Sequence, residues 1–423
     1  MYEKTTLSNG LRVITHAMPA SFSVSAVILV GAGSRYESAE QAGISHFLEH
    51  MLFKGTRQRP TPKAIAETIE GVGGVLNAGT EKELTSYYVK VAHQHGSLAL
   101  ELLTDMLRHS RFLSAEVEKE QHVITEEIHM TEDMPQELVN SLIDELIWPD
   151  HPLGREIAGT EASIKGMRRP ALLAYVHERY VPNNMVVSVA GNVRHEQVVE
   201  EAQRLLGSLR PGPVRPYLAA PGAPGQVRQA VRVKDIEQAH LCVSAGGLPR
   251  QHPDRRALDI QNLILGGGMS SRLFLEIRER RALAYDVQAY LDYFEDTGAS
   301  VIYAGTDPEQ LPACLDAILE EMRRLRCQPT PADELKRAKE YLKGRMLLGL
   351  EDNSGLAHWL GSQELLTNRI QTVEEIIARV DAVTADDVQR VSQSVFDPTL
   401  IRMAVVGPAT DGKALEDLLE GAA

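Results

Sequence analysis

The chain has few cysteines and no long apolar run. Three of its 423 residues are cysteines, Cys242, Cys314 and Cys327, and no two are spaced as C-x-x-C. This excludes a disulfide framework and favours a reducing compartment. No run of about 18 apolar residues exists, so we expect no membrane span. The polar N-terminal residues leave no room for a secretory signal, so we expect a cytoplasmic protein.

Positive charge is also scarce. Lys and Arg number 44 against 58 Asp and Glu, for a net charge of -14, and no Lys/Arg-rich block stands out. Non-specific nucleic-acid binding needs a basic surface, so we expect no nucleic-acid partner. Hydrophobic residues at 43% and charged residues at 24% are typical of a soluble globular protein. The length predicts two or three domains.

A stretch rich in proline and glycine divides the chain near its middle. Residues 209–228 contain five prolines and three glycines, a composition that cannot continue a helix or a central strand. We therefore predict a linker at 209–228 between a domain at 1–208 and a domain at 229–423. The first half ends in NNMVVSVAGNVRHEQVVEEAQRLL and the second in PTLIRMAVVGPATDGKALEDLL. Each reads as a strand, a glycine turn and an amphipathic helix, which indicates a duplicated domain.

Strand and helix patterns alternate within the first half. Residues 6–16 predict a hairpin around Asn9-Gly10, and residues 73–92 predict a second hairpin. Helical periodicity follows over 97–108 and from 114 to about 132. This mixture predicts an α+β protein.

The segment SHFLEHMLFKG carries the clearest chemical pattern. His46 and His50 are four residues apart, so a helix places both imidazoles on one face, where they can bind one Zn²⁺. Glu49 lies beside them, where it can activate a water. The apolar residues between them predict a buried helix, in which two histidines and a glutamate need a partner. By chance H-x-x-[DE]-H would occur only about 0.06 times in a chain of this composition.

A catalytic zinc needs a third protein ligand and one open position. The predicted helix from residue 114 offers Glu120, Glu126 and Glu127. Glu120 and Glu127 are seven residues apart and share one helical face. Helical phase alone does not choose between Glu126 and Glu127, which point about 100° apart. By itself, this helix reads equally as a solvated acidic surface.

The whole arrangement resembles the insulinase, or pitrilysin, family of zinc peptidases. HFLEH matches that family's inverted signature H-x-x-E-H. The resemblance covers nearly the full chain, because further segments follow in the family's order: LSNGLRV, AGISHFLEHMLFKGT, GGVLNAGT, VITEEIHM, HPLGREIAGT, YVPNNMVVSVAGNV and SSRLFLEIRERRALAYDV. It implies two tandem homologous halves, each a mixed, mainly antiparallel sheet packed against helices.

The resemblance also implies roles for residues of the first half. His46, His50 and Glu127 are expected to bind one Zn²⁺ per chain, with Glu49 as the general base. Glu120 is expected to orient a ligand histidine, a partner that metal-bound imidazoles generally have.

Further residues outside the metal cluster match the family's substrate site. Arg278 and Tyr285 correspond to an arginine–tyrosine pair that the second half contributes to hold the substrate backbone. Asn77 and Ala78 begin an edge strand expected to receive the substrate as an added strand. Ala282 stands where the family usually has glycine.

The expected function is that of a zinc metalloendopeptidase acting on extended or unfolded peptides, inside a chamber formed by the two halves or by a dimer. A homodimer is expected, and a heterodimer with a related subunit is the other assembly. The alternative is a non-catalytic structural subunit, like the core subunits of respiratory complexes that share this fold. The intact signature and Glu127 argue against that alternative.

Overall fold

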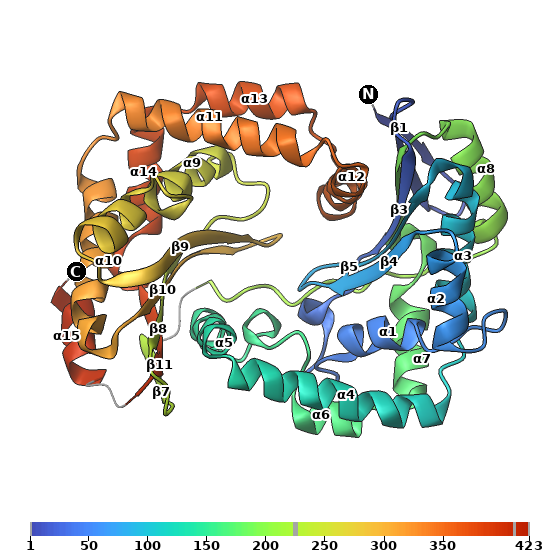
Figure 1. Cartoon of the computed structure of the whole chain (residues 1–423), viewed down its shortest axis with the longest axis horizontal. Coiled ribbons are helices and arrows are strands. Elements are labelled where there is room, and N and C mark those ends of the chain that lie inside the picture. The colour runs from blue at the N-terminus through green and yellow to red at the C-terminus, as the bar shows by residue number, and fades with distance from the viewer. Residues whose placement is uncertain (1, 223–226, 409–411, 422–423) are drawn as a thin grey trace. The chain divides into compact units, whose positions relative to one another are not determined.

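The computed structural model describes residues 2–222, 227–408 and 412–421 and forms two compact units (Figure 1). Each unit is built from separate stretches of the chain and is described by itself. The first unit contains residues 1–129, 156–218 and 347–371, and the second contains residues 130–155, 219–346 and 372–423.

A six-stranded sheet forms the centre of the first unit, in the order β1-β2-β6-β3-β5-β4. Only β2 and β6 pair in parallel, and all other neighbours are antiparallel. Both predicted hairpins are present, as β1–β2 around the left-handed Gly10 and as β4–β5. The strands are β1 Tyr2–Thr6, β2 Arg12–Ala17, β3 Ser23–Val30, β4 Val75–Thr80, β5 Thr85–Ala92 and β6 Met185–Gly191.

Helices cover both faces of this sheet. Helices α3 and α8 lie against one face, and α12, from the second half of the sequence, lies against the other, over β3 and β6 (Figure 1). The α-helices whose residues belong wholly or mostly to this unit are α1 Ile44–Leu52, α2 Pro62–Glu70, α3 Gly96–His109, α4 Ser114–Asp133, α6 Glu161–Gly166, α7 Arg169–Arg179, α8 His195–Leu206 and α12 Asn353–Thr367. The short helices are η1 Ser34–Tyr36, η2 His93–His95 and η4 Pro182–Asn184.

The second unit repeats this sheet with five strands, in the order β7-β11-β8-β10-β9. Again one pair is parallel, β7 with β11, and the rest are antiparallel. The order matches β2-β6-β3-β5-β4 position by position, which supports the duplication indicated by the sequence. The strands are β7 Gln229–Val233, β8 Ala239–Gly246, β9 Ala284–Tyr293, β10 Gly298–Thr306 and β11 Arg402–Gly407.

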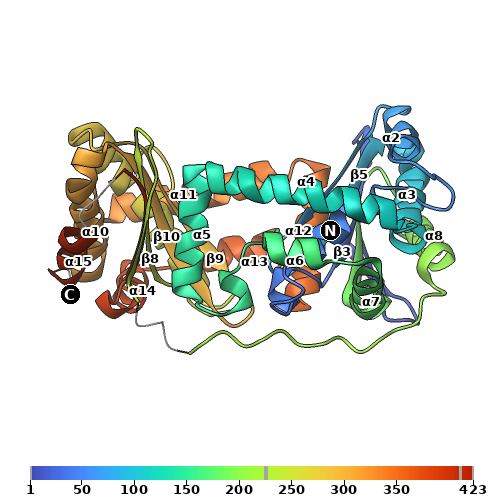
Figure 2. The same ribbon diagram turned by 90° about the horizontal axis from the view of Figure 1, so that it is seen from below.

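Helix α5, from the first half of the sequence, packs on β11 and β8 in the second unit (Figure 2). The helices belonging wholly or mostly to this unit are α5 Pro135–Ile147, α9 Arg255–Gly266, α10 Leu311–Cys327, α11 Ala332–Gly349, α13 Val373–Ala382, α14 Ala385–Val395 and α15 Gly412–Gly421. The short helices are η3 Pro152–Gly154, η5 Phe274–Arg280, η6 Pro308–Gln310 and η7 Pro398–Leu400.

The compact units therefore differ from the two halves predicted along the sequence. Each sheet takes one covering helix from the other half: α12 joins the first unit and α5 joins the second. Both helices contribute to buried cores. Leu356, Ala357 and Leu360 of α12 pack with Val27 and Leu29 of β3. The boundaries at 208 and 229 stay a prediction about the sequence repeats, whereas each compact unit contains residues from both halves.

The predicted linker begins as an extended segment held against the first unit. The described part of 209–228, which omits 223–226, contains no helix or strand. Side chains of the unit bind its backbone: Asn183 exchanges two hydrogen bonds with Gly212, and Arg179 donates to the carbonyl of Arg215 at 2.8 Å. Because this segment pairs with no strand, these side chains satisfy part of its backbone N–H and carbonyl groups.

The α+β class and the two mixed, mainly antiparallel sheets are confirmed, with 52% helix and 19% strand. In the described part of the chain, no helix is both long enough and apolar enough to cross a membrane.

Candidate metal centre

Helix α1 presents His46 and His50 on one face. Its apolar residues Phe47, Leu48 and Met51 are fully buried in the core of the first unit, which fixes the rotation of the helix. The two imidazoles therefore lie together, with ring centroids 4.7 Å apart, and each side chain keeps about a fifth of its surface exposed. The spacing of four residues thus brings the two histidines predicted as ligands together.

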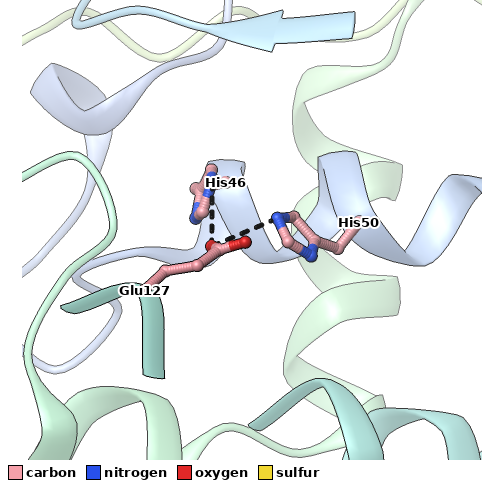
Figure 3. A group of neighbouring side chains, drawn as sticks. All are labelled: His46, His50 and Glu127. Atoms are coloured by element: carbon pink, nitrogen blue, oxygen red, sulfur yellow. Dashed lines mark ion pairs between the residues drawn. The ribbon is translucent and has the colours of Figure 1, made fainter. Parts of the chain in front are cut away.

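Helix α4 adds a carboxylate to this pair. Oε2 of Glu127 lies 3.7 Å from Nε2 of His46 and 3.5 Å from Nε2 of His50 (Figure 3). Glu126 is directed elsewhere: its side chain is 77% exposed, and its Oε1 lies 3.8 Å from Nδ1 of His129. The structure thus places the carboxylate of Glu127, and not that of Glu126, beside the two histidines.

The three groups fit a zinc ion. Their ligand atoms all lie within 4.8 Å of one another. A tetrahedral zinc with bonds of about 2.0–2.1 Å separates its ligands by about 3.3 Å, close to the two measured separations. Burial, with the neighbouring His50 charge, lowers the pKa of His46 to about 4. His46 is therefore neutral at neutral pH, the form that binds metal.

Glu120 contacts His50 at Nδ1, the ring nitrogen that does not face Glu127. Its Oε2 lies 3.0 Å from Nδ1 of His50, and its Oε1 accepts from Nζ of Lys54 at 2.7 Å. Burial of Glu120 would raise its pKa, but the hydrogen bonds from His50 and Lys54 lower it overall. An ionised Glu120 keeps the proton of His50 on Nδ1 and leaves Nε2 directed at Glu127.

Glu49 lies one turn after His46 on the same helix and does not join the cluster of ligands. Its Oε2 accepts a 2.6 Å hydrogen bond from the hydroxyl of Thr80, at the end of β4. Burial raises the pKa of Glu49, and the negative charge of Glu127 raises it further. The hydrogen bond from Thr80 and the charge of His50 lower this pKa, but the overall shift is upward. A raised pKa brings a carboxylate closer to the range useful for a general base.

Strand β4, which carries Asn77 and Ala78, is one of the two edge strands of the first sheet. Val75 is 54% exposed and Asn77 is also exposed. The backbone N–H of Ala78 donates to Oδ1 of Asn77 at 2.9 Å. An exposed edge strand is able to pair with an added strand. Its far end is tied to Glu49 through Thr80.

Arg278 and Tyr285 lie together in the second unit. The Arg278 guanidinium lies over two rings, 4.9 Å from the centroid of Phe274 and 4.5 Å from that of Tyr285. Tyr285 is 76% exposed. Among the described residues, the interactions of Arg278 are these two ring contacts. Ala282, between the two, has a left-handed φ of 49°, which explains why glycine suits this position.

Sequence reasoning missed two residues of the centre. Lys54, in the segment LFKG, pairs with Glu120, which lies far along the sequence on α4. Thr80, in the segment NAGT, donates to Glu49, which lies on α1. The signal for both was their place inside segments already matched to a family. Their specific contacts depend on how α1 packs against α4 and β4, which no local pattern encodes.

Two family models match the chain. One, described as insulinase (peptidase family M16), matches residues 12–161, and the other, described as the peptidase M16 inactive domain, matches residues 167–342. The first range contains the whole cluster of His46, His50 and Glu127. The second contains Arg278 and Tyr285.

A curated relative is similar over nearly the full length. The protein named "Uncharacterized zinc protease YmxG" of Bacillus subtilis (strain 168) is 37% identical over 409 residues, which cover 97% of this chain and 99% of the relative.

Solved structures share the fold. "The crystal structure of a protease from Helicobacter pylori" aligns with a TM-score of 0.89 at 23% identity, covering 96% of this chain and 99% of that one. A chain of "Complex III2 from Candida albicans, Inz-5 bound" aligns with a TM-score of 0.85 at 20% identity, covering 99% of both chains.

Proposed function

Because the chain belongs to the insulinase family, peptidase family M16, we propose that it is a zinc-dependent endopeptidase that hydrolyses extended or unfolded peptides. One observation carries this proposal: His46, His50 and Glu127 converge, while Glu49 lies beside them without joining the cluster. The relative of Bacillus subtilis that is named as a zinc protease supports zinc as the metal and proteolysis as the activity.

His46, His50 and Glu127 would hold one zinc ion per chain. Such a zinc supplies Lewis acidity, polarising a peptide carbonyl and making a water nucleophilic near neutral pH. Glu49 takes the proton of the attacking water at its carboxylate and delivers it to the leaving amine. Glu120 fixes the ring of His50, and Lys54 keeps the Glu120 carboxylate in place.

Substrate would bind along β4 as an added strand, with Asn77 and Ala78 as its first contacts. Main-chain pairing gives affinity that depends little on side chains, so the substrate must present free backbone N–H and carbonyl groups. Thr80 joins this strand to Glu49, which would bring the paired backbone close to the base. Folded proteins, whose backbone groups are already paired, are poor candidates.

Peptide digestion tests this substrate class. We expect unstructured peptides of mixed sequence to be cut at internal bonds, and a stable folded domain containing the same sequence to remain intact. Mass spectrometry of the products identifies the bonds. Removal of single residues from peptide ends, or equal cleavage of the folded domain, would contradict the proposal.

Arg278 and Tyr285 would hold a substrate carbonyl by hydrogen bonds. We expect the double variant Arg278→Ala, Tyr285→Phe to lower kcat/KM by about 10- to 100-fold, since hydrogen bonds to charged groups contribute about 1.5–3 kcal/mol. Zinc content should stay at the wild-type level. Arg280→Ala is the matched control, because Arg280 lies on the same η5 but pairs with Glu276 and is 75% exposed. Wild-type kcat/KM in the double variant would contradict a role of Arg278 and Tyr285 in holding the substrate.

The alternative is a non-catalytic subunit, favoured by the similar fold of a chain in the fungal complex III structure. A protein of this kind would fail to cut any peptide even when loaded with zinc.

We also propose that the working assembly is a homodimer with a chamber for the peptide, and a heterodimer with a related subunit is the other arrangement. Light scattering on the purified chain distinguishes a self-assembled dimer from a monomer that needs a partner.

A further inference from the structure

The start of helix α1 lacks an ordinary capping side chain. Its N-cap residue is Gly43, with a left-handed φ of 89°, so no side chain of that residue can accept from the first turn. The first N–H groups of a helix have no partners inside the helix and need acceptors from elsewhere. Here the first turn leads directly into His46, so its position decides where one metal ligand lies.

A carboxylate from outside the helix supplies these acceptors. Glu37 follows η1 and is buried, with 4% of its surface exposed. Its Oε2 accepts from the N–H of Gly43 at 2.7 Å, and its Oε1 accepts from the N–H of Ser45 at 2.8 Å. Both oxygens therefore bind the first turn of α1 and set its direction as well as its position. The negative charge also suits the positive end of the helix dipole.

A second contact fixes the same turn from another side. The backbone of residues 158–159 approaches Gly43 so closely that a Cβ on Gly43 would collide with the carbonyl of Ala158. Ser163 adds a 2.7 Å hydrogen bond to the carbonyl of Ala42. The close approach of the two backbones also gives a physical reason for glycine at position 159, because a Cβ there would collide with the carbonyl of Ala42.

We propose that Glu37 is a positioning residue for the metal centre: its bidentate hydrogen bonds to the first turn of α1 hold His46 in place to bind zinc. This inference rests on the proposed function, because it assumes that His46 is a ligand. Among the described residues, the hydrogen bonds of Glu37 to α1 go to backbone N–H groups of its first turn, not to the His46 side chain. Its effect on zinc passes through the helix backbone.

The variant Glu37→Gln keeps the volume of the side chain and one acceptor oxygen, so the protein is expected to fold. Zinc affinity, measured by competition with a chelator, should fall about 10-fold, at the lower end of the loss for partners that orient a ligand. We expect kcat to fall by a similar factor and KM to change little, because β4 is untouched. In the metal-free protein, amide exchange over residues 43–47 should become faster.

Thr61→Ala is the matched control, because Thr61 caps α2 in the same unit and touches no residue of the metal centre. It should lower Tm without changing zinc affinity or exchange in α1. Glu37→Asp, which keeps the charge but is one methylene shorter, is the second variant if Glu37→Gln fails to fold, and the same losses are expected.

Two results would overturn the proposal: wild-type zinc affinity and exchange in the Glu37 variants, or an equal loss of zinc affinity in Thr61→Ala. A wild-type protein that bound no zinc would instead refute the proposed function. The exchange measurement on the metal-free protein would still decide whether Glu37 holds the first turn.

Discussion

Replacement of Glu49 by glutamine is expected to lower kcat by about 10³-fold or more while zinc content stays at the wild-type level. General base catalysis contributes about 10²–10⁴-fold, and the amide of glutamine cannot accept the proton of the water. Zinc binding should persist, because Glu49 lies outside the cluster of ligand atoms and its partner is Thr80. The measurement is peptide turnover together with metal analysis of the same sample.

Thr80→Val separates the charge of Glu49 from its orientation. It removes the hydroxyl that donates to Glu49 but keeps the carboxylate. This control should lower kcat much less than Glu49→Gln does. Near-full turnover in Glu49→Gln would mean that another group takes the proton, and loss of zinc would mean that Glu49 is a ligand.

Glu127→Gln is expected to weaken zinc binding by more than about 100-fold and to abolish turnover at limiting zinc. Loss of a direct ligand should exceed the 10- to 100-fold loss caused by removing a partner of a ligand. The neutral amide also removes the negative charge that lies 3.5 Å and 3.7 Å from the two imidazoles. Competition with a chelator measures the affinity.

Glu126→Gln makes a closely matched control. It removes the same charge from the adjacent position of the same helix, but its side chain is 77% exposed and directed at His129. We expect wild-type zinc affinity and turnover in this variant. Equal losses in the two variants would show that the charge of α4, rather than the placement of Glu127, governs metal binding.

Much of the metal centre could be predicted because it follows from spacing along one helix. The four-residue separation of His46 and His50 places both on one face of α1, and the structure retains that arrangement. The choice between Glu126 and Glu127 could not be made from helical phase, because it depends on how α4 is rotated against α1. The resemblance to the family supplied the choice, and the packing of α4 explains it.

Contacts between distant segments were out of reach of sequence patterns. The carboxylate of Glu37 reaches the first turn of α1 only because η1 and α1 are brought together in the folded unit. The exchange of α5 and α12 between the sheets was also missed. Both helices show apolar residues suited to a sheet, but periodicity does not reveal which sheet they cover. The order of the strands, by contrast, repeats between the halves, as the paired sequence segments indicated.

Cleavage of unstructured peptides by zinc-depleted and zinc-restored wild-type protein is the decisive test of zinc-dependent peptidase activity. We predict that the depleted protein is inactive, and that activity returns in proportion to bound zinc until about one ion per chain is present. Internal cleavage should appear only in the restored sample. A restored protein that holds zinc in this ratio yet cuts no peptide, or a depleted protein that cuts equally well, would contradict a zinc-dependent endopeptidase.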